Sequence, residues 1–297
     1  MQSIKYWIEA ARLKTIPASF SPVMLGSSMA YSENTFYPMA MFYCFAFALL
    51  CQIGTNFSND YLDYIKGADS DQRIGPRRLV ASGMIRPKTM LIVSIITLAL
   101  AFFAGLNLIP YGGNWLLLIG VLSILFAWCY TGGPYPLAYN ALGDIFVILF
   151  FGIIAVSISY FVQAQSVTWL VLFNGIACGI YVNNLLIINN IRDYKEDFAN
   201  NKRTSIVLFG IPFGLKIYLS SLLIIFIAAI LNYMRDESLL HFMIIIPRLL
   251  VQSSFSSLSR SKEMHFCFIL FWLYYLDDDK YENIRCGRRC FYSESNF

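Results

Sequence analysis

Long apolar stretches recur along most of this 297-residue chain, and they constrain its fold more than any other feature. A helix needs roughly 20 apolar residues to cross the hydrocarbon core of a bilayer. In lipid only helices or closed barrels satisfy the backbone hydrogen bonds, and these stretches lack the alternation of barrel strands. We therefore predict an all-α membrane protein. The candidate spans are residues 16–31, 39–57, 90–109, 115–131, 142–161, 169–191, 213–233 and 239–251.

Composition agrees with this prediction. Hydrophobic residues make up 58% of the chain and charged residues 13%, whereas soluble domains are near half apolar and about one quarter charged. The apolar run that follows Lys14 continues past Gly26 without a typical cleavage site, so we expect an uncleaved first membrane helix. The seven cysteines show no metal-binding spacing, and we assign them neither a disulfide nor zinc.

Basic residues gather in alternate loops between the predicted spans. The loops near Glu33, Gly112 and Gln165 contain no Lys or Arg, and the loop near Asp236 contains only Arg235. By the positive-inside rule, the N-terminus and the loops after the second and sixth spans are cytoplasmic. Those segments carry Lys5, Arg12, Lys14, Lys66, Arg73, Arg77, Arg78, Arg86, Lys88, Lys195, Lys202 and Arg203.

Aspartates alternate with basic residues where the second span reaches the predicted cytoplasmic side. Asn59 and Asp63 are four residues apart, so a continuing helix places both on one face. Magnesium prefers such oxygen ligands, usually one or two carboxylates together with phosphates and water. Gly67 can end the helix, and the arginines beyond it suit bidentate phosphate binding. A solvated loop that obeys the positive-inside rule explains the arginines but not the interleaved aspartates.

A second polar helix end follows the sixth span. Asp193 and Asp197 are one helical turn apart, and Asn189 lies one turn earlier. Two carboxylates on one face need a cation, either a metal ion or a neighbour such as Arg192 or Lys195. Together with the first segment on the same membrane face, the pair suggests metal ions that hold one diphosphate from two sides. Two halves facing one cavity would explain this similarity between the helix ends, and chance is the alternative.

These residues give the chain a resemblance to the UbiA superfamily of membrane prenyltransferases. The hallmarks of that family are an NxxxD-type first motif, which Asn59, Asp63 and Asp69 match, and a DxxxD second motif, which Asp193 and Asp197 match. Residues 12–17, 66–76, 130–134, 142–144 and 189–193 resemble the branch that prenylates 1,4-dihydroxy-2-naphthoate on the way to menaquinone. The resemblance covers about residues 10–231.

The resemblance implies about eight to nine transmembrane helices around a central cavity, with Asp-rich helix ends on the cytoplasmic side of the cell membrane. It implies Mg²⁺-dependent alkylation of an aromatic ring carbon by a polyprenyl diphosphate, with loss of diphosphate and CO₂, to give demethylmenaquinone. Beyond both substrates and the bilayer, we expect neither nucleic acid nor an obligate protein partner. The implied metal ligands are Asn59, Asp63, Asp69, Asp193 and Asp197, all but Asp69 also being catalytic. The implied substrate contacts are Lys66, Asp69, Arg73, Arg77, Asn190, Arg192, Lys202 and Tyr130, the last by cation–π shelter of the allylic cation.

The chain departs from the family pattern at two places. After Asp197 it reads Phe-Ala-Asn-Asn before Lys202, where the family usually has a basic residue followed by Ala-Gly. After Val251 a Ser-rich stretch leads to an apolar run of about 13 residues, which is short for a span. We therefore expect a UbiA-like domain over residues 1–251 and an atypical tail over 252–297. A shifted reading frame that disrupts the last helix would explain this tail.

Other interpretations remain open at this point. The acceptor could be another ring, such as 4-hydroxybenzoate or homogentisate. A transporter or channel would place charges near the membrane midplane in broken helices, whereas these carboxylates cluster at helix ends. A non-catalytic membrane scaffold would leave the carboxylate pairs unexplained.

Overall fold

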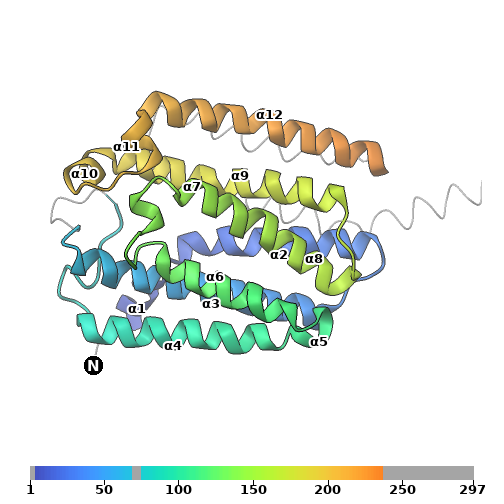
Figure 1. The fold of residues 1–297 in the computed structure, drawn as a ribbon, viewed down its shortest axis with the longest axis horizontal. Helices are drawn as coiled ribbons and strands as arrows, with labels where there is room; N and C mark the ends of the chain where they lie inside the picture. Colours follow the sequence, from blue (N-terminus) through green and yellow to red (C-terminus); the bar gives the residue numbers. More distant parts are fainter. Residues whose placement is uncertain (1–3, 69–74, 237–297) are drawn as a thin grey trace, which may run out of the picture.

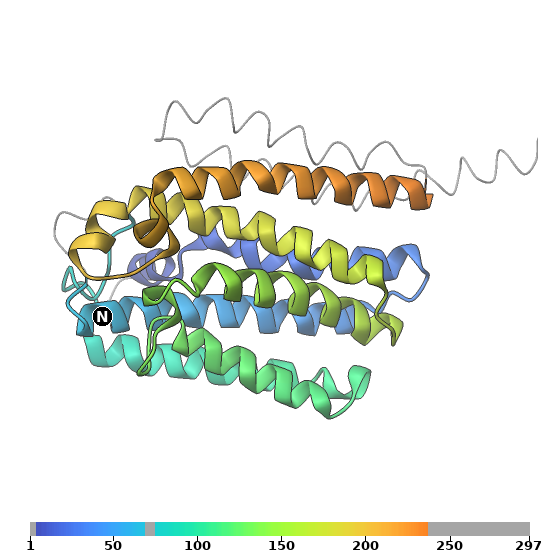
Figure 2. The same cartoon turned by 45° about the horizontal axis from the view of Figure 1, so that its top comes forward.

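The protein is a bundle of long helices that lie side by side along its longest axis (Figures 1 and 2). The computed structural model describes residues 4–68 and 75–236. Within these ranges there is no β-strand, and an isolated bridge joins Asn140 to Arg203. The prediction of an all-α protein is confirmed.

In the described part of the chain, five helical segments are long and apolar enough to cross a membrane. Three of them are single α-helices, one combines α7, η3 and α8, and one is most of α12. They are Pro38–Ile65 (α3), Pro87–Leu106 (α4), Gly143–Ala164 (α7 Gly143–Val147, the π-helix η3 Ile148–Ile154 and α8 Ala155–Ala164), Trp169–Arg192 (α9) and Ile211–Asn232 within α12 (Ile211–Asp236).

The expected number of eight to nine spans is not confirmed in the part of the chain that the structure describes. The predicted first and fourth spans form α2 (Ile16–Ser32) and α6 (Trp115–Cys129), which have 17 and 15 residues. Both are short for a bilayer core that needs about 20 residues in a helix. The predicted span 239–251 and the tail 252–297 lie outside the described residues.

The remaining helices are short and lie at the ends of the bundle or in connections. They are α1 (Ile4–Ala11), η1 (Leu13–Thr15), α5 (Ile109–Gly112), η2 (Leu137–Tyr139), α10 (Tyr194–Ala199) and α11 (Ser205–Phe209). In Figure 1, α10, α11 and the beginning of α7 lie at the same end of the bundle as the end of α3.

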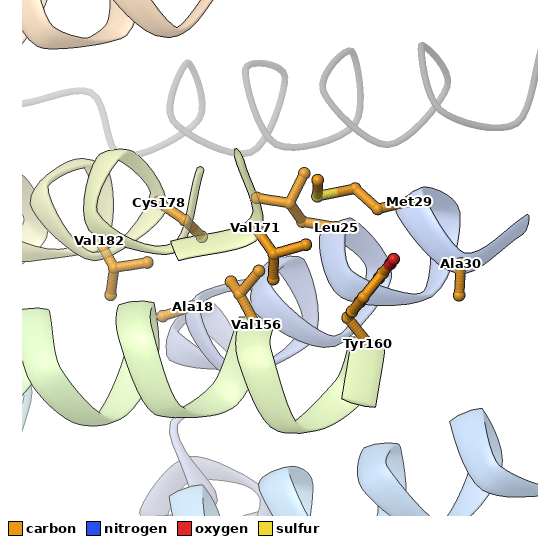
Figure 3. Close-up of a cluster of buried hydrophobic side chains, with 9 residues drawn as sticks. All are labelled: Ala18, Leu25, Met29, Ala30, Val156, Tyr160, Val171, Cys178 and Val182. Atoms are coloured by element: carbon orange, nitrogen blue, oxygen red, sulfur yellow. The ribbon is translucent and has the colours of Figure 1, made fainter. Parts of the chain in front are cut away.

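Buried apolar side chains from α2, α8 and α9 form one core of the bundle (Figure 3). Val156, Tyr160 and Val171 are completely buried there. Next to this core α9 packs closely on η3, because glycines remove the side chains between them. A Cβ added at Gly152 would lie 2.4 Å from the carbonyl oxygen of Gly175, and this contact fixes how closely the two helices approach.

Several amide side chains inside the spans bond to neighbouring segments. Asn56 Nδ2 donates to the carbonyl of Ala11 at 2.9 Å, which ties α3 to the N-terminal segment. Asn174 and Asn232 exchange amide hydrogen bonds of 3.2 and 2.9 Å between α9 and α12. Interhelical bonds of this kind are a usual role for amides at membrane depth.

Candidate active site

The first aspartate-rich segment forms the last turns of α3 and the turn that follows. α3 continues past Asn59 and Asp63, so these side chains lie one helical turn apart on one face. The helix ends in a Schellman turn, in which the N–H groups of Ala68 and Gly67 donate to the carbonyls of Asp63 and Tyr64, both at 3.0 Å. Gly67 has a φ of 66°, which glycine adopts without a steric penalty. The turn thus fixes where the chain leaves the helix beyond Asp63.

The Asp63 carboxylate is buried and contacts two other parts of the chain. The Arg78 guanidinium forms an ion pair with Oδ2, and the Tyr139 hydroxyl donates to Oδ1 at 2.9 Å. One turn earlier, Asn59 Oδ1 accepts a hydrogen bond of 2.7 Å from the Thr131 hydroxyl. Because Tyr139 and Thr131 both belong to the α6–α7 connection, the first motif packs against that loop.

The second motif lies at the break between α9 and α10. Asp193 occupies the break, and the Asp197 N–H donates to its carbonyl at 2.8 Å, which keeps the two residues one turn apart. Arg192 holds Asp193 through two contacts, Nε–Oδ1 at 2.6 Å and Nη2–Oδ2 at 2.8 Å. Lys202 Nζ lies 3.1 Å from Asp197 Oδ1. Both carboxylates and the nearby Asn190 are buried, so each acid has its cation in a partly water-excluded place.

Tyr139 connects the two motifs. Its hydroxyl bonds to Asp63, and its ring centroid lies 4.3 Å from Lys66 Nζ and 5.8 Å from Lys202 Nζ. Ammonium groups at such distances are attracted to the face of an aromatic ring. Since Lys202 also pairs with Asp197, continuous contacts run from Asp63 through Tyr139 to Asp197.

Three hydrogen bonds to main-chain carbonyls hold the same junction. The Arg203 N–H donates to the carbonyl of Tyr139 at 3.2 Å, and Asn200 Nδ2 donates to the carbonyl of Ala68 at 2.7 Å. Lys66 Nζ also donates to the carbonyl of Thr131. The connections after α3, α6 and α10 therefore meet at one end of the bundle.

Tyr130, at the start of the α6–α7 connection, belongs to this cluster. It lies within electrostatic range of Asp63 and Asp197, one carboxylate from each motif, and of Asp144 in α7. Partial burial lowers the pKa of the Lys66 ammonium, and the Asp63 carboxylate acts in the opposite direction. The site thus combines acidic and basic groups within a small volume.

The donor set of the site suits a hard divalent cation such as Mg²⁺. Asp63, Asp193 and Asp197 each pair with a basic side chain, because a buried carboxylate needs a positive charge beside it. Among residues 4–68 and 75–236, no group of three His, Cys, Asp or Glu side chains could hold a metal ion by itself. A metal ion at either motif would therefore complete its ligands with phosphate oxygens or water, as Mg²⁺ commonly does.

The structure does not bring every predicted residue to this cluster. Arg77 turns to the outside, where its Nε and Nη2 lie 3.2 and 3.1 Å from the Glu9 carboxylate and its side chain is 45% exposed. Its neighbour Arg78 takes the inward place. Asp69 and Arg73 lie outside the described residues.

Sequence reasoning missed Arg78, Thr131 and Tyr139 as site residues. Arg78 was part of the basic run, but the sequence did not distinguish it from Arg77. The loop that carries Thr131 and Tyr139 contains residues that resemble the family, but no spacing in the sequence singles out these two side chains. Thr131 contacts Asn59 over 72 positions along the chain, and Tyr139 contacts Asp63 over 76 positions.

The family model described as the UbiA prenyltransferase family matches residues 19–275. The chain belongs to the UbiA prenyltransferase family. Its resemblance to the 1,4-dihydroxy-2-naphthoate branch is also confirmed by curated relatives. The 1,4-dihydroxy-2-naphthoate octaprenyltransferase of Mycobacterium tuberculosis is 36% identical over 71% of this chain and 72% of its own length. The enzyme of the same name from Escherichia coli is 37% identical over 69% of this chain and 68% of its own.

Solved structures show the UbiA fold. A UbiA homolog from Archaeoglobus fulgidus bound to GPP and Mg²⁺ has a TM-score of 0.68 with this chain, covering 91% of it and 98% of the homolog at 14% identity. The same homolog bound to DMAPP and Mg²⁺ has a TM-score of 0.65. At this identity the likeness shows the fold, and the site has to be argued from this chain's own residues.

Proposed function

We propose that this UbiA family member transfers a polyprenyl group from polyprenyl diphosphate to 1,4-dihydroxy-2-naphthoate, with release of diphosphate and CO₂, to give demethylmenaquinone. The observation that carries the proposal is the chain of contacts from Asp63 through Tyr139 to Lys202 and Asp197, which joins both motifs at one end of the bundle. The names of the relatives support the acceptor.

Magnesium binding is the first part of the proposed mechanism. Carboxylates of Asp63, Asp193 and Asp197 and the amide oxygen of Asn59 would hold the metal ions, with Asp69 as a further predicted ligand. Solved structures of a UbiA homolog bound to GPP or DMAPP and Mg²⁺ support Mg²⁺ as the metal. When bound, Mg²⁺ offsets the charge that develops on the leaving diphosphate.

The basic side chains of the site would bind the diphosphate. Arg78 and Lys202 each pair with a carboxylate and would become available to phosphate oxygens if metal ions satisfied those acids. Lys66 lies over the Tyr139 ring beside them. Arg192 and the predicted contacts Arg73 and Asn190 belong to the same set. Charge-assisted hydrogen bonds of this kind hold phosphates strongly.

The apolar faces of the bundle fit the remaining requirements of the reaction. The isoprenoid tail is apolar, and a groove open to lipid would accept it while the diphosphate stays at the polar helix ends. Tyr130 interacts electrostatically with a carboxylate of each motif, and its ring would shelter an allylic cation. Clustered Lys and Arg support a cytoplasmic position for this end of the bundle, in the cell membrane.

A direct assay tests the proposed function. Membranes containing the full-length chain are incubated with Mg²⁺, a polyprenyl diphosphate and, separately, 1,4-dihydroxy-2-naphthoate, 4-hydroxybenzoate or homogentisate, and products are identified by mass spectrometry. We expect prenylated naphthoquinol with loss of CO₂, and none after chelation of Mg²⁺. Product from only one of the other rings would replace the proposed acceptor, and no product from any ring would overturn prenyl transfer.

Replacing Arg78 and Arg77 separately tests which arginine serves the diphosphate. We expect Arg78→Ala to raise the KM for polyprenyl diphosphate by about 10- to 100-fold, because a charge-assisted hydrogen bond is lost. Arg77→Ala removes an exposed ion pair with Glu9 and should change that KM by less than about threefold. Equal effects of the two variants in steady-state kinetics would contradict the assignment of Arg78.

A further inference from the structure

Asp60 is a buried carboxylate on α3 that the proposed mechanism does not use. It is 1% exposed, and both of its oxygens accept main-chain hydrogen bonds. The Leu79 N–H donates to Oδ2 at 3.0 Å, and the Val80 N–H donates to Oδ1 at 3.1 Å. Around the helix axis Asp60 lies about 100° from Asn59 and about 60° from Asp63. Its two oxygens are already used by main-chain N–H groups of another segment, so it serves the chain as an anchor.

The segment that Asp60 holds also carries Arg78. Leu79 and Val80 are 0% and 3% exposed and belong to an apolar cluster that includes Phe57 of α3. The preceding residue, Arg78, reaches Asp63, which lies one turn after Asp60 on the same helix. One short segment is therefore bound to α3 twice, by its main chain at Asp60 and by a side chain at Asp63.

We propose that Asp60 is a positioning residue for prenyl diphosphate binding: it fixes the Leu79–Val80 main chain so that Arg78 is held at the diphosphate site. The inference rests on the proposed function, in which Arg78 donates to the diphosphate when metal ions satisfy Asp63. A long arginine side chain reaches a defined point only if its own backbone is fixed. The two amide hydrogen bonds to Asp60 fix that backbone in the two residues next to it.

A double-mutant cycle in the full-length chain tests this role. In Asp60→Asn, an amide N–H₂ replaces one of the two acceptor oxygens and faces a main-chain donor. We expect the KM for geranyl diphosphate to rise about 10-fold or more, as for other supporting residues around a site. In an Arg78→Ala background, Asp60→Asn should add less than about twofold, because its effect passes through Arg78. A full additional 10-fold rise in that background would overturn the proposal.

Limited trypsin digestion provides a readout that does not depend on activity. The bond after Arg78 joins it to Leu79, whose N–H is held by Asp60. We expect faster cleavage after Arg78 in Asp60→Asn, measured by mass spectrometry of the fragments. Glu9→Gln is the matched control, because it releases the exposed tether of Arg77 on the same segment. It should change the KM for geranyl diphosphate by less than about twofold.

The outcomes separate this inference from the proposed function. If the wild-type chain transfers no prenyl group, the proposed function fails. If trypsin cleaves Asp60→Asn as slowly as wild type, Asp60 does not anchor the Leu79–Val80 main chain. If Asp60→Asn does not assemble in the membrane, Asp60→Glu keeps both acceptors at a shifted position and should show the same rise in KM. A wild-type KM in either assembled variant, or failure of both to assemble, would overturn the positioning role.

Discussion

Asp63→Asn in the full-length chain is expected to lower kcat/KM for prenyl transfer by about 10²- to 10³-fold, the loss found when a group that stabilises developing charge is removed. Asp63 is buried, meets the Arg78 guanidinium and accepts a 2.9 Å hydrogen bond from Tyr139. The isosteric amide keeps the shape but supplies no negative charge for a metal ion. Steady-state kinetics at saturating Mg²⁺ measures the effect.

Asp197→Asn should cause a loss of similar size, because the second motif holds the other side of the same diphosphate. Glu9→Gln is a suitable control, since Glu9 is a partly exposed acid that pairs with Arg77 on the outer surface. Activity within about threefold of wild type for Asp63→Asn, in protein that elutes normally in detergent, would remove Asp63 from the active site.

Gly152→Ala is expected to destabilise the bundle. The new Cβ would lie 2.4 Å from the carbonyl oxygen of Gly175 and 2.5 Å from the Cα of Gly179, so it meets backbone that cannot rotate away. Overpacking of this kind costs about 1–3 kcal/mol. For a chain of this size the midpoint of thermal unfolding in detergent should fall by about 2–10 °C.

Gly120→Ala is the matched control for this experiment. Gly120 also lies in an apolar helix, α6, but its nearest neighbour would be Phe47 Cε2 at 3.9 Å, an ordinary contact. Alanine is the better helix former by about 1 kcal/mol, so its midpoint should stay equal or rise slightly. Equal midpoints for the two variants would show that the contact between η3 and α9 is looser than described.

Much of the fold follows from local patterns in the sequence. The apolar stretches predicted α3, α4, α9 and α12, since hydropathy over about 20 residues reports directly on burial in lipid. The polar end of α3 was predicted as a continuing helix that ends at Gly67, and the Schellman turn at Gly67 matches that expectation. The expected eight to nine spans are not confirmed among the described residues, where α2 and α6 have 17 and 15 residues.

The contacts of the site could not be predicted in the same way. The choice between Arg77 and Arg78 depends on which backbone N–H groups Asp60 binds, and the sequence does not contain that geometry. Tyr139 lies in the α6–α7 connection, and it is positioned by contacts with Asp63 of α3 and with Lys202, which follows α10. The π-helix η3 packs closely against the glycines of α9, and no local pattern in the sequence indicated it.

The central claim is that the two aspartate motifs hold one shared diphosphate, and a crystal structure with Mn²⁺ and a non-ionisable prenyl thiolodiphosphate tests it most directly. Anomalous scattering would locate the metal ions at either motif. We predict metal peaks that contact carboxylate oxygens of both Asp63 and the Asp193–Asp197 pair, with one diphosphate between them. Metal ions at a single motif, or a diphosphate bound away from one of them, would contradict the claim.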